Sequence, residues 1–222
     1  MRFRMPTMDY AKARETMVEQ QVRPWDVLDV RVLDALATLP REAFVNETHR
    51  ALAYSDLELP IGHGEKMMKP VLEGRALQAL EIDAGDRVLE IGSGSGFLAA
   101  CLGRLAREVV GIERHADLAE AARARLQTQS IANVRIETAD AFSWEGDGQF
   151  DAICVSGAVS AIPERFLRWL RPGGRLFAVQ GVSPVMDAVL VRADVNGTRT
   201  QSLFETDLAY LAGAAPAPKF DF

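Results

Sequence analysis

The sequence predicts an α/β protein with a doubly wound, mostly parallel sheet, a helical N-terminal section and an antiparallel hairpin at the C-terminal edge. From residue 87 onward, short apolar or β-branched runs alternate with helical segments, as is typical of parallel strands joined by crossovers. A glycine-rich turn follows the first of these runs. Near the end, Asn196-Gly197 separates two strand-like runs, and this dipeptide is a strong hairpin signal.

The composition is that of a globular protein. Of its 222 residues, 48% are apolar and 25% are charged, which suits one large domain with an appendage. The 25 Lys and Arg residues against 31 Asp and Glu residues give a net charge of −6. Proteins that bind nucleic-acid phosphates usually have a strong basic excess, so we expect no nucleic-acid partner.

The sequence also predicts a cytoplasmic protein. The two cysteines, Cys101 and Cys154, stand in apolar stretches and are too few for a disulfide framework. No stretch approaches the ~18 apolar residues of a membrane span, and the first ten residues lack the apolar core of a signal peptide. We therefore expect no membrane partner. The oligomeric state cannot be read from the sequence.

The N-terminal section is predicted to be helical. Apolar residues recur at helical spacing over residues 10–21 and 29–38, and prolines follow both segments. Residues 59–70 resemble a loop, after which helical spacing resumes through residue 80. We therefore divide the chain into a section at 1–80 that packs on a main domain at 81–212, and an extended tail at 213–222.

The main domain is predicted to alternate strands with helices. The expected strands are 87–91, 109–113, 134–137, 150–156 and 175–179, and the expected helices are 96–105, 116–129 and 162–170. Two further strands, 188–195 and 198–204, flank Asn196-Gly197 and form the predicted edge hairpin. The tail is rich in Ala and Pro and has no packing period.

The glycine-rich turn, residues 92–96, has the spacing Gly-x-Gly-x-Gly. Glycine allows the backbone to turn tightly and to approach a ligand, and the helix that follows offers unpaired amides. The dinucleotide fingerprint is usually Gly-x-Gly-x-x-Gly, built around a pyrophosphate. The shorter spacing favours a nucleoside ligand without phosphates.

Two acidic residues lie where such a nucleoside needs them. Glu113 ends the second strand, about 20 residues after the first glycine, where a carboxylate can accept both ribose hydroxyls. Asp140 follows the third strand and can accept a hydrogen bond from an adenine amino group.

In order, the glycine turn, Glu113, Asp140, Phe150-Asp151-Ala152-Ile153 and Leu170–Leu176 resemble the motifs of class I S-adenosylmethionine-dependent methyltransferases. The resemblance implies a Rossmann-like fold, S-adenosyl-L-methionine as cofactor and S-adenosyl-L-homocysteine as product. It assigns cofactor binding to Lys66, Met67, Glu90, Gly92, Ser93, Gly94, Ser95, Gly96, Glu113, Arg114, Asp140 and Ala141.

The segments before the glycine turn narrow the choice. Residues 17–23, 32–36, 39–45 and 59–64 resemble the protein-L-isoaspartate O-methyltransferase family, and the likeness extends from about residue 17 to residue 191. It implies a protein-repair methyltransferase that methylates the free carboxylate of L-isoaspartyl residues in polypeptides.

This reaction makes few demands on side chains. A carboxylate with a pKa near ~4 is already ionised at pH 7, so alignment and desolvation matter more than a general base. We expect no metal, because the sequence shows no ligand cluster and its three histidines, His49, His63 and His115, are scattered.

The chain departs from the family in its early loop. Met68 stands where the family has a serine regarded as the active-site residue, and methionine cannot donate a hydroxyl hydrogen bond. Lys66 and Lys69 flank it, and we assign Lys69 the attraction of an anionic substrate. Residues 208–212 also differ from the family segment that borders the substrate.

These departures leave alternatives open. One is a methyltransferase of the same fold with a small-molecule acceptor. A second is a cofactor-binding protein that lacks isoaspartyl activity because Met68 replaces the serine. A nicotinamide dehydrogenase is a third, although the glycine spacing and Asp140 argue against it.

Overall fold

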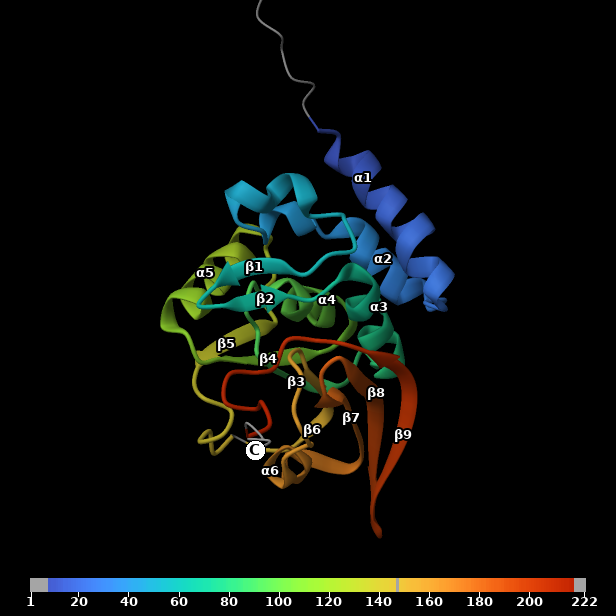
Figure 1. Ribbon diagram of the computed structural model, residues 1–222, viewed down its shortest axis with the longest axis vertical. Coiled ribbons are helices and arrows are strands. Elements are labelled where there is room, and N and C mark those ends of the chain that lie inside the picture. The colour runs from blue at the N-terminus through green and yellow to red at the C-terminus, as the bar shows by residue number, and fades with distance from the viewer. Residues whose placement is uncertain (1–7, 147, 218–222) are drawn as a thin grey trace, which may run out of the picture.

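A computed structural model describes residues 8–146 and 148–217 and confirms the predicted fold (Figure 1). Its main sheet has seven strands in the order β5-β4-β3-β6-β7-β8-β9, with β5 and β9 at the edges. The first five in this order run parallel, and β7, β8 and β9 pair antiparallel. Their bounds are β3 Arg87–Ile91, β4 Glu108–Glu113, β5 Val134–Thr138, β6 Phe150–Val155, β7 Leu170–Val182, β8 Val185–Asp194 and β9 Gly197–Thr206.

Helices cover both faces of the sheet, because each buried strand carries apolar side chains on both sides. Val88 on β3 joins a core cluster with α4 (Phe97–Leu105), α5 (Ala116–Thr128) and the N-terminal helices. Its neighbour Leu89 joins a second cluster with α6 (Glu164–Arg168). The predicted doubly wound arrangement is therefore present.

The prediction of a helix over 162–170 is wrong at both ends. Helix α6 has only five residues, and the chain then enters β7. Leu170 pairs with Phe150 on β6, and the Phe150 amide donates to the Trp169 carbonyl oxygen at 2.7 Å. Strand pairing thus replaces the last helical turn, and β7 begins five residues before its predicted start.

The N-terminal helices form as predicted and pack on the same core. They are α1 (Tyr10–Met17), α2 (Val30–Thr38) and α3 (Pro70–Ala79), with a π-helical turn at Val18–Val22 and short 3-10 helices at Arg23–Trp25, Arg41–Ala43 and Glu47–Leu52. Asp9 and Asp29 cap α1 and α2 by accepting main-chain amides. Figure 1 places α1 at one end of the molecule and the β8–β9 turn at the other.

Residues 59–67, predicted as a loop, form an antiparallel hairpin of β1 (Leu59–Gly62) and β2 (Glu65–Met67). Its turn, Gly62-His63-Gly64, has φ values of 115°, 54° and 81°, so all three positions favour glycine and two of them have it. Figure 1 shows this hairpin beside α5. The prediction failed because strands of four and three residues are too short to show alternation.

The C-terminal hairpin confirms the Asn196-Gly197 signal, with Asp194 and Gly197 paired across the turn. After β9 the chain returns to β6, where Leu211 N–H donates to the Ala158 carbonyl oxygen at 2.9 Å. Within the predicted tail, Ala214 is buried and accepts from Ser160 N–H, whereas residues 218–222 lie outside the described residues. Over the described residues, no helix is long and apolar enough to cross a membrane.

Candidate active site

The glycine turn joins β3 to α4 and has no room for side chains. Gly92, Gly94 and Gly96 have φ values of 90°, 49° and 84°. A Cβ atom on Gly92 would lie 2.8 Å from Leu211 Cδ2, and one on Gly94 would lie 2.7 Å from Ile61 Cδ1. The turn is therefore pressed between the returning C-terminal segment and the β1–β2 hairpin, and only glycine fits at both positions.

Glu113, at the end of β4, holds this turn in place. Its Oε2 accepts the Gly94 amide at 2.8 Å, and its Oε1 accepts the His115 amide at 2.8 Å. The residue is only 5% exposed. An ionised carboxylate offers about four acceptor positions, so Glu113 retains capacity for a ligand's hydroxyl groups.

Glu90, on β3, is a buried carboxylate without a hydrogen-bond partner in the described structure. Burial, together with the negative charge of Glu113, raises its pKa to about 7. The Ser93 hydroxyl is also buried without a hydrogen bond of normal geometry, but it lies close enough to Glu90 to oppose the rise in pKa. Buried polar groups are normally satisfied, so these two side chains mark a place for a polar or cationic ligand.

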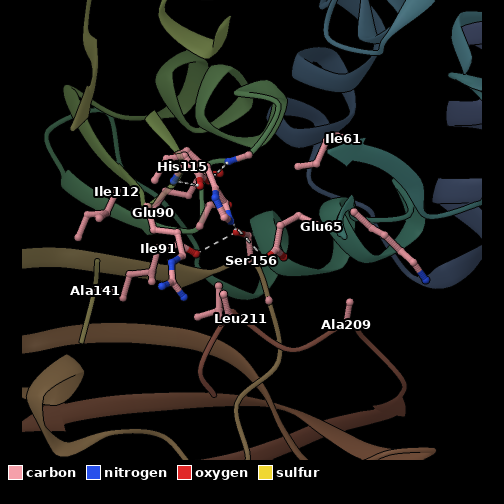
Figure 2. A pocket seen from close by; sticks show the side chains of 18 of the residues that line it. Ile61, Glu65, Glu90, Ile91, Ile112, His115, Ala141, Ser156, Ala209 and Leu211 are labelled. Atoms are coloured by element: carbon pink, nitrogen blue, oxygen red, sulfur yellow. Dashed lines mark hydrogen bonds and ion pairs between the residues drawn. The ribbon is translucent and has the colours of Figure 1, made fainter. Parts of the chain in front are cut away.

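A cavity opens beside these groups (Figure 2). It brings together most of the residues predicted from the sequence. Those that line it are Lys66, Met67, Met68, Glu90, Gly92, Ser93, Gly94, Ser95, Glu113, Arg114, Asp140 and Ala141.

Gly96 and Lys69 are the two predicted residues outside this cavity. Gly96 is the N-cap of α4, where a Cβ atom would lie 3.0 Å from Ala122 Cβ, so it serves close packing against α5. Lys69 lines a neighbouring side pocket instead.

Asp140 lies at the rim of the cavity, directly after β5. Its Oδ1 accepts the Phe142 amide at 2.9 Å, which fixes the turn, and its Oδ2 lies 3.8 Å from Arg114 Nη2. Both side chains remain partly exposed. The pair therefore closes the β4–β5 side of the cavity with polar atoms.

Met68 is buried in the cavity wall, and Arg41 fixes its backbone by hydrogen bonding. Arg41 Nη2 donates to the Met68 carbonyl oxygen at 2.7 Å, and Arg41 Nε donates to the Ala53 carbonyl oxygen at 2.8 Å. Arg41 Nη1 also pairs with Glu73, which lines the cavity from the first turn of α3. Sequence reasoning missed both residues, although Glu73 interrupts an otherwise apolar helical face.

The side pocket is lined by Glu58, Lys66, Lys69, Ser183, Asp207, Leu208, Ala209 and Tyr210. Lys66, Leu208, Ala209 and Tyr210 also line the main cavity, so the two spaces adjoin. Lys66 Nζ is paired with Glu58 Oε2 at 3.1 Å. The described residues supply no ion pair or hydrogen bond to the Lys69 ammonium group, which leaves its charge available.

The expectation that the three histidines are scattered is wrong for two of them. The rings of His63 and His115 are stacked, and His115 lines the main cavity. Tertiary folding brings together the hairpin turn and the start of α5, which are far apart in sequence. In the described part of the chain, no group of three His, Cys, Asp or Glu side chains is arranged to hold a metal ion.

Comparisons with known proteins identify the family. Residues 12–207 match the family model of protein-L-isoaspartate (D-aspartate) O-methyltransferase. The chain is 44% identical over 193 residues to a protein-L-isoaspartate O-methyltransferase of Methylorubrum extorquens, covering 86% of this chain and 83% of the relative. It is 38% identical over 221 residues to protein-L-isoaspartate O-methyltransferase 1 of Rhodopseudomonas palustris, covering 96% and 90%.

The fold is also shared with a solved Plasmodium falciparum structure, described as a protein-L-isoaspartate O-methyltransferase in complex with S-adenosyl-L-homocysteine. The TM-score is 0.78 at 21% identity, with 92% of this chain and 99% of that chain covered. The match over 12–207 and the identities to full-length relatives agree with the resemblance seen in the sequence. The chain belongs to the protein-L-isoaspartate (D-aspartate) O-methyltransferase family.

Proposed function

We propose that this protein is an S-adenosyl-L-methionine-dependent O-methyltransferase that methylates the free carboxylate of L-isoaspartyl residues in polypeptides. One observation carries the proposal: in a chain of this family, the glycine turn held by Glu113 and the segment carrying Met68 line one cavity. Family membership favours methyl transfer over the dehydrogenase alternative. The names of the relatives favour a polypeptide acceptor over a small molecule.

The cavity fits S-adenosyl-L-methionine by its own chemistry. Glu90 and Ser93 are buried without partners and suit the cationic amino-acid end, and Glu113 keeps acceptor capacity for the ribose. We assign the rest of the contacts to Lys66, Met67, Gly92, Gly94, Ser95, Arg114, Asp140 and Ala141, whereas Gly96 serves the packing of α4 against α5. When bound, the cofactor supplies an electrophilic methyl group attached to a sulfonium sulfur.

The acceptor carboxylate needs no general base, because it is ionised at neutral pH. The protein must hold it in line with the methyl group and strip its water. Met67, Met68 and Leu208, all at most 5% exposed, give this end of the cavity an apolar wall. A dry wall strengthens the remaining electrostatic contacts to the acceptor.

We assign the attraction of the acceptor carboxylate to Lys69. The thioether of Met68 cannot donate the hydrogen bond that a serine hydroxyl would give. Lys69 follows it directly and points its unpaired charge into the adjoining side pocket. An ammonium group there replaces a short hydrogen bond with a longer-range Coulomb attraction.

The direct test is transfer of a labelled methyl group to an isoaspartyl peptide and to its ordinary aspartyl isomer, by the parent and by Met68→Ser. Transfer by the parent to the isoaspartyl peptide alone supports the proposal and shows that the serine is dispensable. Transfer by Met68→Ser alone would identify a scaffold that has lost its catalytic group. If neither protein transfers while both bind the cofactor, isoaspartyl methylation is excluded.

We further propose that the reaction serves protein repair in the cytoplasm. The composition, the two buried thiols and the polypeptide substrate of the family support this assignment. In this view residues 1–80 are a helical section with a substrate and cofactor loop that packs on the main domain, residues 81–212 bind the cofactor, and residues 213–222 are the C-terminal tail. No nucleic acid or membrane partner enters the proposal.

A further inference from the structure

His115 lines the main cavity and carries a ring nitrogen that no described group uses. It follows Glu113 by two residues and lines the cavity, where Figure 2 labels it together with Glu65 and Ile61 of the hairpin. Its Nε2 atom is buried without a hydrogen-bond partner among the described residues. The nearest acidic atom, Glu65 Oε1, lies 3.7 Å away, beyond hydrogen-bond length. A buried ring nitrogen of this kind suits a ligand.

The plane of the His115 ring is fixed by His63. The two rings are stacked, with centroids 4.1 Å apart and planes inclined by 9°. His63 is itself anchored, because its Nε2 lies 2.9 Å from both carboxylate oxygens of Asp117 in the first turn of α5. The stack therefore connects the hairpin turn to the beginning of α5.

The same hairpin covers the glycine turn. Ile61 on β1 leaves no room for a side chain at Gly94, and Glu65, Lys66 and Met67 on β2 line the cavity. A ligand that contacts His115 would thus lie beneath the β1–β2 hairpin. His63, in the turn of that hairpin, holds it beside the start of α5. His115 therefore contacts the hairpin through His63 and faces Glu65 at the place where such a ligand would lie.

We propose that His115 Nε2 hydrogen-bonds the nucleoside part of the cofactor, and that His63 is a positioning residue that holds the His115 ring through the stack. The nucleoside is indicated because His115 stands with Glu113, Arg114 and Asp140 at the ends of β4 and β5. The cationic amino-acid end is assigned to Glu90 on β3 and to Ser93 within the glycine turn. This inference rests on the cofactor of the proposed function, not on its methyl acceptor.

The test is calorimetric binding of two probes, S-adenosyl-L-homocysteine and methylthioadenosine, which lacks the amino-acid part. His115→Phe keeps an aromatic ring for the stack and removes the nitrogens, so we expect about tenfold weaker binding of both probes. His63→Ala removes the stack and should weaken both about threefold to fivefold. His63→Phe places a side chain on the same backbone, at φ 54°, and keeps an aromatic ring for the stack. Its affinity for both probes should therefore stay within about twofold of the parent.

His49→Ala is the matched control, because the His49 ring lies beside Thr48 and outside both pockets of the described structure. Thermal melts without ligand confirm that each variant is folded. Parent-like binding by His115→Phe would overturn the hydrogen bond. Weakening of S-adenosyl-L-homocysteine alone would place the contact at the amino-acid part and overturn the nucleoside assignment. Equal weakening by His63→Phe and His63→Ala would overturn positioning by the stack.

These outcomes are separable from the proposed function. A parent protein that binds both probes but transfers no methyl group to isoaspartyl peptides would exclude that substrate and leave this inference standing. A parent protein that binds neither probe would overturn both.

Discussion

Arg41 and Glu73 form an ion pair that is closed to solvent, with side chains 0% and 2% exposed. The same guanidinium group holds the carbonyl oxygens of Ala53 and Met68. One side chain thus fixes three segments behind the acceptor end of the cavity. A buried pair of this kind adds little stability over an apolar replacement, but removal of one partner is costly.

Burial raises the pKa of Glu73 and Arg41 opposes that rise, so without Arg41 the carboxyl group becomes protonated and stays buried without its partner. We therefore expect Arg41→Met to lower the free energy of unfolding by about 3–5 kcal/mol, as measured by urea denaturation. The double variant Arg41→Met with Glu73→Leu removes the unpaired carboxyl group and should recover at least half of the loss. Lys12→Ala breaks only the exposed pair with Glu15 and should change stability by less than about 0.5 kcal/mol. A double variant no more stable than the single one would contradict the explanation.

The second prediction concerns pH. Burial raises the pKa of Glu90 to about 7, so its ionised fraction increases between pH 6 and pH 8. A cationic cofactor prefers the ionised form, and we expect S-adenosyl-L-methionine to bind roughly tenfold more tightly at pH 8 than at pH 6. Calorimetry at both pH values measures this ratio. Glu90→Gln cannot ionise and should bind with the same affinity at both, whereas an unchanged pH slope would exclude Glu90 as its source.

The same group has a predictable effect on the ligand-free protein. The pKa of Glu90 in the folded state is above the ordinary glutamate value of 4.5, so the folded state binds the proton more tightly than the unfolded state. The contribution of Glu90 to stability is therefore complete below about pH 4.5 and is lost as the pH rises through about 7. Glu90→Gln should reduce the loss of stability over that window.

The third prediction uses the lack of space at the glycine turn. A methyl group on Gly94 meets Ile61 Cδ1 at 2.7 Å and requires an L residue at φ 49°. Gly94→Ala should push the hairpin away and weaken S-adenosyl-L-homocysteine binding by at least about tenfold. Gly85→Ala is the matched control, since a Cβ atom there meets nothing within 4 Å. Equal affinities for the two variants would show that the turn tolerates a side chain.

The fourth prediction isolates the charge of Lys69. The parent, loaded with S-adenosyl-L-homocysteine, should bind an isoaspartyl peptide about tenfold more tightly than the matched isoasparaginyl peptide, which lacks the carboxylate. Lys69→Ala should abolish this difference, leave cofactor affinity unchanged and raise the KM for the peptide. Lys69→Arg keeps the positive charge and should retain much of the preference for the isoaspartyl peptide.

Lys66→Ala is the neighbouring control, and its effect should be smaller because Glu58 already neutralises Lys66. If Lys69→Ala discriminates between the two peptides as well as the parent does, the acceptor carboxylate does not bind at Lys69.

The main sheet could be predicted because its signals are local. The strand at 87–91 is a compact apolar run that ends in glycine, and Asn196-Gly197 specifies its hairpin without reference to the rest of the chain. The β1–β2 hairpin could not be found in this way, because its pairs depend on contacts with Gly94 and Leu118 far along the chain. The prediction of where α6 ends failed for a similar reason, because the pairing of Leu170 with Phe150 on β6 overrides a helical sequence pattern.

The residues of the site also fall into those that local sequence signals reveal and those that only the folded structure reveals. Residues of the glycine turn and the strand-end acids Glu113 and Asp140 could be named because parallel strands deliver their carboxyl ends to one edge of the sheet. Arg41 and the His63–His115 stack join the site only through tertiary packing. The residues next to them in sequence form no motif or regular spacing that would mark Arg41, His63 or His115 as part of a site.

The two edge strands of the sheet carry polar side chains along their length. The outer strand β9 reads Gly-Thr-Arg-Thr-Gln-Ser over its first six residues, all exposed, and β5 at the opposite edge contains Arg135 and Glu137. Extended segments of other polypeptides can add to unpaired strand edges. Charged, solvated edges discourage such segments from adding to the sheet. The sheet is thereby protected against edge-to-edge association with other chains, including further copies of this one.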